Sequence, residues 1–559
     1  MNKMTSKSYK KRDASLPKGR QVDDASIEEV QALLGDLAIQ RDHLIEGLHL
    51  IQDGVGYLSA AHLTALADIF RLSQAEVYEV ASFYDHFDIV MEGETPPPPL
   101  TIRISTCLSA ELAGAHKLIE VMRMVVDPEK VRILAAPCMG QCDYSPAAMV
   151  GKRVIKFATV EKLLAAIEEK GGAELPPYEM LAEYIAGGGY EMLRRVVDGE
   201  LKADDVIETI AQSGLGGLGG AGFPAARKWG FVRSYEGPRY LTVNGDEGEP
   251  GTFKDRYWLH RHPHWMLEGA QIAAKIVECD RIYLYMRDEY PAVIEILKRE
   301  VIAMEKAGVL HTPVEIRRGA GAYICGEESA MIESIEGKRG MPRLRPPFIA
   351  EVGLFGRPTL NHNVETLHWI PQILTYGAKW FANKGWNEKH KGTRSYSVSG
   401  RVKRPGVKLA PAGIPLETLI EEHCGGMADG HKFKAFLPGG ASGGIFPASM
   451  AHMAMDFGTF EPHGGFVGSH AVVILSDQDS IYDAVINTMS FFRHESCGQC
   501  TPCRAGTHKL VGMLKDPATE HQLYNDLMQV MGDSSICGLG QAAANCVKHL
   551  MKYFPEEMK

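Results

Sequence analysis

Hydrophobic residues change their spacing several times along the chain, and each change predicts a different kind of element. Between residues 25 and 92 they recur at helical spacing, as at Leu44, Leu48 and Ile51. The four prolines at 96–99 cannot continue a helix and predict a stiff linker. We therefore expect the first part of the chain to be a small helical unit that ends at this linker.

Two Ser–Glu pairs mark expected helix starts within this unit. Ser26 with Glu29, and Ser73 with Glu76, have the spacing of a capping box, in which each side chain accepts a hydrogen bond from the other residue's backbone. We therefore predict that one helix begins after Ser26 and another begins after Ser73.

After the prolines the spacing becomes alternating. Residues 100–104 alternate between apolar and polar, which predicts a strand, and a helix at 113–125 and a strand at 131–135 follow. A loop with two thiols, Cys138 and Cys142, comes next. This order indicates a thioredoxin-like α/β domain. The two thiols could bind a metal or form a redox pair, and two thiols alone are only half of a metal site.

The remainder of the chain divides into an α/β part, a β-rich part and a helical part. The Pro- and Gly-rich stretch 174–189 predicts the linker that precedes the α/β part. Residues 395–409 alternate around Pro405 and Gly406, which predicts a hairpin. From residue 479 the apolar residues return to helical spacing, which predicts a terminal helical bundle.

Composition narrows the class of protein. A chain of 559 residues exceeds one hydrophobic core and predicts several domains. The net charge of −10 argues against nucleic acid as a partner. No apolar run is long enough to span a bilayer, and the N-terminus lacks the apolar core of a secretory signal, so we expect a cytoplasmic protein. The basic first 24 residues predict a disordered arm.

The densest chemical signal is a group of cysteines near the C-terminus. Three of the eleven cysteines, Cys497, Cys500 and Cys503, fall within seven residues, and Cys537 follows after a gap. This spacing suits a [4Fe–4S] cluster, which takes four thiolate ligands. Zinc sites usually combine two paired knuckles, or cysteine with histidine, and fit the pattern poorly. We therefore predict a one-electron carrier at these four residues.

A glycine-rich stretch opens the α/β part. Six of the nine residues at 214–222 are glycine, and backbone amides in such a stretch can approach a phosphate closely. Lys228 adds a positive charge. The spacing matches neither the dinucleotide fingerprint nor the P-loop, so a flexible loop remains the alternative interpretation.

Two acidic glycine turns and one basic aromatic segment favour a cofactor over a flexible loop. The stretch 242–256 follows an apolar strand and concentrates carboxylates, which suit ribose hydroxyls or ring N–H donors. The stretch 319–333 is a second glycine-rich turn, with two adjacent acids that open a helix. The stretch 343–348 offers a cation and an aromatic ring for a second nucleotide. Together they predict a polar, phosphate-bearing cofactor.

The N-terminal regions resemble the small [2Fe–2S] subunit of the NADH dehydrogenase module of respiratory complex I. The resemblance rests on "YLSAAHLTALADIFRLSQAEVYEVASFYDHF" and "CMGQCDYSPAAMV". The family's first cysteine pair falls at Ser105 and Ala110 here, and Cys107 lies between them. We therefore predict a degenerate, structural copy of the domain without a normal [2Fe–2S] cluster. Its remaining candidate ligands are Cys107, Cys138 and Cys142.

From about residue 180 to the C-terminus the chain resembles the flavin- and NADH-binding subunit of complex I. Relatives of that subunit occur in NAD-reducing hydrogenases and NAD-dependent formate dehydrogenases. The resemblance implies an FMN site at Gly217, Gly219, Lys228, Asn244, Asp246, Tyr323, Gly326, Glu327, Glu328 and Asn363. It implies an NAD site at Phe223, Phe231, Glu249, Glu328, Arg345 and Phe348. The expected roles of Glu249 and Glu328 are to orient the nicotinamide, with no acid–base residue required for the hydride step.

This sequence departs from the family's pattern at four positions. Gly216 and Leu218 stand where arginines are common, His362 stands where a second asparagine is usual, and Arg345 stands where lysine is common.

The resemblance completes the predicted architecture, a multidomain α/β protein. We expect a basic arm (1–24), a helical segment (25–92), a thioredoxin-like domain (100–170), an FMN- and NAD-binding domain (185–390), a ubiquitin-like β-grasp domain (393–475) and a helical [4Fe–4S] domain (478–559).

The predicted function is that of a diaphorase subunit. Stretches such as "LPKGRQV" and "SYSVSGRVKRPGVKLAPAG" look most like the β subunit of a formate dehydrogenase. That resemblance implies a partner α subunit with a molybdenum- or tungsten-pterin centre, whose electrons pass through [4Fe–4S] and FMN to NAD⁺. The alternatives are a diaphorase subunit of a hydrogenase or of NADH-quinone oxidoreductase, and a non-catalytic scaffold subunit.

Overall fold

The structure is a computed structural model that describes residues 19–169, 172–516 and 520–558. Of the predicted basic arm, residues 1–18 lie outside the described part. The chain divides into two units, residues 1–97 and 98–559, and each is described by itself. The division falls within the run of prolines at 96–99.

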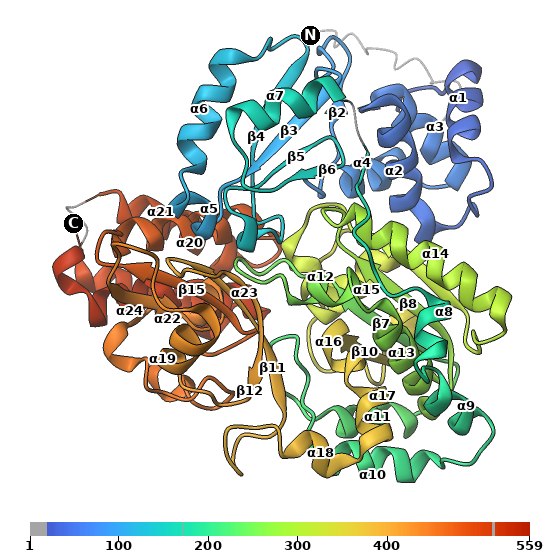
Figure 1. The fold of residues 1–559 in the computed structure, drawn as a ribbon. Helices are drawn as coiled ribbons and strands as arrows, with labels where there is room; N and C mark the ends of the chain where they lie inside the picture. The colour runs from blue at the N-terminus through green and yellow to red at the C-terminus, as the bar shows by residue number, and fades with distance from the viewer. Residues whose placement is uncertain (1–18, 170–171, 517–519, 559) are drawn as a thin grey trace, which may run out of the picture. The chain divides into compact units, whose positions relative to one another are not determined.

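The first unit is helical (Figure 1). Leu44, Leu48 and Ile51 are all buried. A short parallel pair of strands, β1 (Leu58–Ser59) and β2 (Ile89–Val90), joins the segment after α2 to the segment after α4. The helices are α1 (Asp24–Leu34), α2 (Leu44–Val55), α3 (Ala60–Phe70) and α4 (Gln74–Ala81).

One of the two predicted helix starts is confirmed and the other is wrong. Ser73 and Glu76 form a capping box at α4, with each side chain bonded to the other residue's amide. Helix α1 begins earlier than predicted, because Asp23 is its N-cap and accepts a hydrogen bond of 2.9 Å from the amide of Ser26. A carboxylate at this position satisfies a free amide and also interacts favourably with the helix dipole.

The second unit begins with the thioredoxin-like domain. Its sheet has the order β4-β3-β5-β6, with a parallel β3–β4 pair and antiparallel neighbours beyond it. The predicted strands and helix are confirmed. The elements are β3 (Leu100–Ser105), α5 (Leu108–Leu112), α6 (Ala115–Val125), β4 (Val131–Ala136), β5 (Ala148–Val150), β6 (Arg153–Ile155) and α7 (Val160–Glu169).

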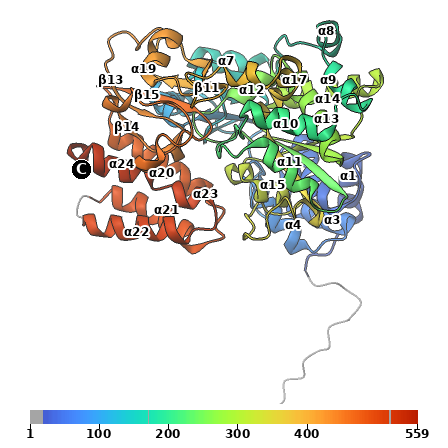
Figure 2. The same cartoon turned by 90° about the horizontal axis from the view of Figure 1, so that it is seen from below.

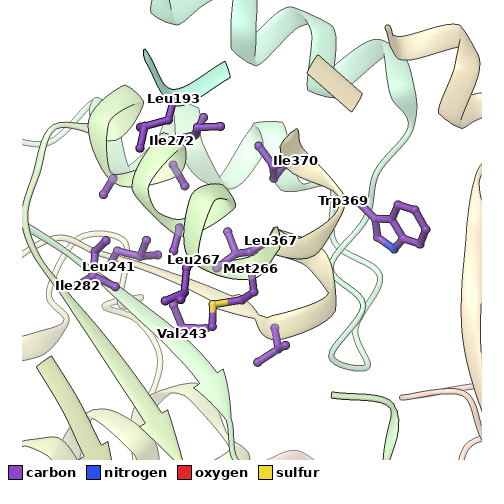
Figure 3. Packing of buried hydrophobic residues seen from close by; sticks show 14 of the residues in the cluster. Leu193, Leu241, Val243, Met266, Leu267, Ile272, Ile282, Leu367, Trp369 and Ile370 are labelled. Atoms are coloured by element: carbon purple, nitrogen blue, oxygen red, sulfur yellow. The ribbon is translucent and has the colours of Figure 1, made fainter. Parts of the chain in front are cut away.

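A parallel four-stranded sheet of order β10-β7-β8-β9 forms the centre of the next domain, the central α/β domain. Helix α13 packs on β7 and β8, where Leu241, Ile282 and Leu267 share one core (Figure 3). The strands are β7 (Arg239–Gly245), β8 (Cys279–Met286), β9 (Val314–Arg318) and β10 (Thr359–Asn363). Because the strands are parallel, the loops after β7 and β10 meet at one edge of the sheet, where ligands bind in folds of this kind.

Eleven helices surround this sheet within the described residues. They are α8 (Leu181–Ala186), α9 (Glu191–Val197), α10 (Ala203–Ser213), α11 (Ala225–Arg233), α12 (Lys254–Leu259), α13 (Pro263–Val277), α14 (Pro291–Ala307), α15 (Glu328–Ile335), α16 (Val364–His368), α17 (Ile370–Tyr376) and α18 (Ala378–Ala382). Helix α15 has Glu327 as its N-cap, so the second acidic turn does open a helix as predicted.

The β-grasp domain is a mixed sheet of order β12-β11-β15-β13-β14. Strands β11 and β12 pair antiparallel across residues 401–405, which confirms the predicted hairpin. The short helix α19 (Leu416–Thr418) runs into a turn of π-helix at Leu419–His423. The strands are β11 (Thr393–Gly400), β12 (Gly406–Pro411), β13 (Phe433–Leu437), β14 (Phe446–Pro447) and β15 (Ala471–Ser476).

The C-terminal region is helical as predicted, and α21 and α22 run side by side (Figure 2). Ile481, Val485 and Met489 on α20 are fully buried along one face. None of the helices in the described residues has the length and apolarity to cross a bilayer. The helices are α20 (Ile481–Glu495), α21 (Thr501–Leu514), α22 (His521–Ser534), α23 (Gly538–Ala542) and α24 (Asn545–Tyr553).

A buried histidine joins the C-terminal helices to the β-grasp domain. The Nδ1 atom of His549 on α24 accepts a hydrogen bond of 3.1 Å from the amide of Ile445. Burial lowers the pKa of His549 to about 4. The folded protein therefore contains the neutral imidazole. The contribution of this imidazole to stability is complete above about pH 6.5, the ordinary histidine pKa.

The free energy of unfolding is expected to decrease as the pH falls from about 6.5 to 4, because in this range the unfolded chain binds a proton on His549 that the folded chain does not bind. At pH 5 the loss in the free energy of unfolding should be about 2 kcal/mol. Thermal unfolding at pH 7 and pH 5 measures it. The His549→Gln variant, whose side-chain oxygen can accept the Ile445 amide without titrating, should lose less. An equal loss in both proteins would assign the effect to other groups.

Candidate functional site

A cavity of about 390 Å³ lies at the edge of the central sheet where β7 and β10 end; we call it the central cavity. Three segments singled out in the sequence meet there: the glycine-rich stretch, the acidic loop after β7 and the turn at Tyr323–Gly326. The predicted FMN residues that line it are Gly219, Asn244, Asp246, Tyr323, Gly326, Glu327 and Asn363. The other three residues of the implied FMN site are not among the described residues that line the cavity: Gly217, Lys228 and Glu328.

The ammonium of Lys228 is bonded to the backbone of β10. Its ammonium donates a hydrogen bond of 3.3 Å to the backbone oxygen of Asn361, and burial lowers its pKa. Glu328 lies at the start of α15, where its carboxylate is 3.4 Å from Arg345 Nη1. Both residues therefore stand near the cavity without lining it.

The glycine-rich stretch divides its amides between the fold and the cavity. Gly217 donates to the Phe223 oxygen at 2.8 Å, Leu218 donates to Thr366 Oγ1 at 2.9 Å, and Gly222 donates to the Gly217 oxygen. The amides at 219–221 border the cavity and donate to no other described residue. Amides placed in this way form an anion site, so the stretch fits the phosphate of FMN.

The Gly219→Ala variant is expected to lose bound flavin. An added Cβ would lie 3.0 Å from the Cβ of Asn363, so the glycine-rich stretch and Asn363 would have to move apart. We expect flavin occupancy to fall about tenfold or more, because a small displacement of a close backbone contact is costly. Flavin released from the purified protein by heat measures it. Gly230→Ala, where a Cβ meets open space, is the matched control and should retain flavin. Equal flavin content in both variants would remove this stretch from the site.

A buried ion network that the sequence reasoning missed forms one wall of the cavity. Lys254 is fully buried, and its ammonium lies 2.8 Å from Asp255 Oδ1, 3.1 Å from Glu365 Oε2 and 3.2 Å from Asn363 Oδ1. Burial lowers its pKa, but the carboxylates of Asp255, Glu365 and Glu247 outweigh burial and hold the pKa above its usual value. The lysine therefore stays charged and fixes Asn363, whose side chain it contacts.

Glu249 connects the central α/β domain to the β-grasp domain across the cavity. One carboxylate oxygen accepts hydrogen bonds from the amide and hydroxyl of Ser442, at 2.8 and 2.9 Å. The other accepts one from the Tyr323 hydroxyl. Burial raises the pKa of Glu249. Ser442 and Phe466, both in the cavity lining, come from the β-grasp domain and were not predicted from sequence.

The remaining residues of the implied NAD site lie outside the central cavity. Phe223 and Phe231 are neighbours, with ring centroids 6.3 Å apart, and the Arg227 guanidinium lies over both rings. Phe231 and Phe348 are 47% and 57% exposed. Arg345 forms ion pairs with Glu327 and Glu328. These aromatic faces are therefore open to a ligand that approaches from solvent.

The four C-terminal cysteines converge on a second pocket, the thiol pocket. Cys500 and Cys537 are the N-caps of α21 and α23, so helix N-termini face the sulfurs and favour negative charge there. Burial raises the pKa of Cys537 to about 11, which a bound metal ion must overcome to hold a thiolate. The predicted ligands that line the pocket are Cys497, Cys500, Cys503 and Cys537.

The size of the thiol pocket fits a cluster better than a single ion. In the described residues, no three of its sulfurs all lie within 4.8 Å of one another, although another cysteine group does meet that limit. Two sulfurs bound to one zinc ion lie at most about 4.6 Å apart, since each Zn–S bond is about 2.3 Å. Ile324 and Leu539 line both this pocket and the central cavity, so a flavin and a cluster would be close neighbours.

The cysteine group that meets the limit is Cys107, Cys138 and Cys142 of the thioredoxin-like domain; we call it the thiol triad. Hydrogen bonds from Cys138 and then Cys142 hold the pKa of Cys107 well below its usual range. A [2Fe–2S] cluster takes four thiolates in two pairs. Ser105 and Ala110 occupy the family's other two positions, and alanine has no ligand atom. The residues present do not fit a four-thiolate [2Fe–2S] cluster.

Four segments of the chain match known families. Residues 210–372 match the "Nuo51 FMN-binding domain" and residues 395–446 the "SLBB domain". Residues 483–559 match the "NADH-ubiquinone oxidoreductase-F iron-sulfur binding region". Residues 30–170 match the "Thioredoxin-like [2Fe-2S] ferredoxin". The predicted multidomain architecture and the FMN, NADH and [4Fe–4S] domains are confirmed.

Individual relatives extend these matches. An NADH-quinone oxidoreductase subunit of Rhizobium meliloti (strain 1021) is 40% identical over 400 residues, which is 69% of this chain and 94% of that protein. The corresponding NADH-quinone oxidoreductase subunit of Aquifex aeolicus (strain VF5) is 37% identical over 69% of this chain and 92% of that protein. Among solved structures, a chain of an air-oxidized NAD⁺-reducing [NiFe]-hydrogenase aligns with a TM-score of 0.81 at 30% identity over 94% of both chains.

Proposed function

Because this chain belongs to the family of FMN-binding NADH-quinone oxidoreductase subunits, we propose that it is a diaphorase subunit that exchanges electrons between NAD(H) and a partner protein. The observation that carries the proposal is the shared wall of the central cavity and the thiol pocket, formed by Ile324 and Leu539. Electrons can pass between a two-electron site and a one-electron site only when the two sites are close together.

FMN, when bound, supplies the exchange between the electron pair of nicotinamide and the single electrons of an iron–sulfur cluster. The chain's own residues would bind FMN and orient the nicotinamide. The free amides at 219–221 would hold the phosphate, and Asn363, fixed by Lys254, lies beside them. Glu249, held by Ser442 and Tyr323, keeps a carboxylate in the cavity to accept N–H groups from the nicotinamide end. Phe466 adds an apolar ring to the cavity lining.

The implied NAD residues outside the cavity would bind the rest of that nucleotide. Phe223 and Phe231 offer faces for a base, and Arg345 offers a cation for a phosphate. Arg345 is now paired with Glu327 and Glu328, so nucleotide binding would exchange one anion for another at the same guanidinium. Glu328, once released, would be available to orient the nicotinamide.

The proposed partner is the α subunit of a formate dehydrogenase with a molybdenum- or tungsten-pterin centre. The support is the resemblance of stretches such as "LPKGRQV" and "SYSVSGRVKRPGVKLAPAG" to β subunits of that enzyme. Electrons would then pass from the partner through the thiol pocket and the central cavity to NAD⁺. In this arrangement the α subunit oxidises formate, and this chain handles only the electrons.

A NAD-reducing hydrogenase is a second candidate, and one observation favours it. The hydrogenase chain aligns over 94% of both chains, so the N-terminal regions are included in the match as well as the flavin domain. The relatives from NADH-quinone oxidoreductases cover 69% of this chain.

Isolation of the native complex distinguishes these partners. The complex would be purified through a tag on this chain, its large subunit identified by mass spectrometry and its metals measured. Molybdenum or tungsten together with formate-dependent reduction of NAD⁺ is the expected result. Nickel with hydrogen-dependent reduction would replace the formate dehydrogenase assignment by the hydrogenase. A large quinone-reducing assembly would place the chain in NADH-quinone oxidoreductase.

A further inference from the structure

The thiol triad brings Cys107 together with Cys138 and Cys142, the latter 35 residues further along the chain. The sulfur of Cys142 lies 3.3 Å from that of Cys138 and 3.7 Å from that of Cys107, and all three sulfurs lie within 4.8 Å of one another. Cys107 is the N-cap of α5, Cys138 follows β4, and Cys142 opens a single turn of 3₁₀-helix. The side chains are 7%, 2% and 4% exposed. Such a group is a preformed set of soft ligands in a buried site.

Its dimensions suit one metal ion. Sulfurs that share a tetrahedral ion with Zn–S bonds of about 2.3 Å lie about 3.8 Å apart. A binuclear cluster must fit two irons and two sulfides between its pairs of ligands, which spreads the sulfurs further. We propose that Cys107, Cys138 and Cys142 bind a single divalent ion of the zinc class, in the position where related domains carry [2Fe–2S].

An oxygen atom is available for the fourth position of such an ion. The hydroxyl of Ser105 lies 3.4 Å from the sulfur of Cys107 and is enclosed with it in the protein. Cys107 and Cys138 also border a cavity of about 460 Å³, which can supply water. Zinc accepts both thiolate and oxygen ligands in a tetrahedral set. Binding replaces the thiol protons, which pass to solvent, and involves no change of oxidation state.

The ion would fix a loop that joins two domains. The guanidinium of Arg287 donates to the backbone oxygens of Cys138, at 2.6 Å, and of Glu247. The guanidinium of Arg256 donates to the backbone oxygen of Gly140 at 2.8 Å and contacts Asp143 at 2.6 Å. Both arginines are buried in the central α/β domain. A metal ion at the triad therefore holds the 138–142 loop in the shape that these arginines bind, beside the wall of the central cavity.

Metal analysis of the purified complex tests the proposal through the difference between the wild type and a Cys142→Ala variant. Zinc and iron would be measured by mass spectrometry, together with acid-labile sulfide and flavin. The variant is expected to lose about one zinc-class ion per chain and to keep its iron, sulfide and flavin. Cys424→Ala, which removes an equally buried thiol from the β-grasp core, should lose no metal.

A second measurement serves if Cys142→Ala does not fold. In the wild-type complex the triad thiols should resist alkylation until a chelator is added, and mass spectrometry reads each cysteine separately. Loss of two irons and two sulfides in the variant would show a binuclear cluster and overturn the proposal. So would a disulfide between Cys138 and Cys142, or alkylation of the triad that is unchanged by the chelator. None of these readings depends on NADH oxidation, so the proposed diaphorase function can stand or fall separately.

Discussion

Replacing Cys500 with serine is expected to stop electron transfer to the partner while leaving reduction of the flavin by NADH intact. Cys500 lines the thiol pocket, and the central cavity shares only Ile324 and Leu539 with that pocket among the described residues. Loss of a cluster ligand should lower transfer more than about 100-fold, since changes outside the ligand shell alone cost about 10- to 100-fold. Stopped-flow absorbance follows the flavin, and substrate-dependent reduction of NAD⁺ by the whole complex follows the transfer.

Cys279→Ser is the control for this experiment. Cys279 is buried in β8, away from both the thiol pocket and the thiol triad, so its replacement removes one thiol without touching a proposed ligand set. Both rates should stay near those of the wild type. If Cys500→Ser transferred electrons as fast as this control, the assignment of the thiol pocket as the one-electron outlet would fail.

Replacing Lys254 with methionine should destabilise the central α/β domain by about 3–5 kcal/mol, the usual result of removing one partner from a buried ion pair. The ammonium lies within 3.2 Å of oxygens on Asp255, Glu365 and Asn363. Its loss leaves two buried carboxylates without a cation. Denaturant unfolding followed by tryptophan fluorescence measures the change, because Trp229 is buried in the hydrophobic core of this domain.

Two further variants show whether the effect belongs to the ion network. Lys298→Met, at an exposed position on α14, should change the free energy of unfolding by no more than about 0.5 kcal/mol. Adding Glu365→Gln to Lys254→Met should recover part of the loss, since one of the stranded charges is then removed. A loss of equal size in Lys298→Met, or no recovery in the double variant, would contradict the electrostatic explanation.

Patterns that depend on neighbouring residues were predicted well. The alternation at 395–409 predicted the hairpin that β11 and β12 form. The spacing of Cys497, Cys500 and Cys503 predicted one site, and these cysteines line one pocket with Cys537. The glycine-rich stretch was predicted to approach a phosphate, and residues 219–221 of this stretch do border a cavity, because six glycines in nine residues leave backbone amides accessible. Ser26 was mistaken for a cap, since Asp23 could play the same role three residues earlier.

Features that depend on distant segments were not predictable. Lys254 follows a turn in a charged stretch and has the sequence context of a solvent-exposed lysine; its burial results from Glu365 on another element. Ser442 lies in the glycine-rich stretch 439–444, but nothing in that stretch indicates Glu249, 193 residues away, as its partner. Lys228 fits the family's motif, yet its ammonium bonds to the Asn361 oxygen. In each case the partner that decides the role lies on a different part of the fold.

An anaerobic titration of the purified complex with NADH tests the central claim most directly. The protein is predicted to contain bound flavin, and NADH should bleach its absorbance near about 450 nm before the electrons reach the partner. The flavin content of the Gly219→Ala variant, measured alongside, places that absorbance in the central cavity. A complex that contains no flavin, or whose flavin absorbance is unchanged by NADH, would contradict the assignment of this chain as a diaphorase subunit.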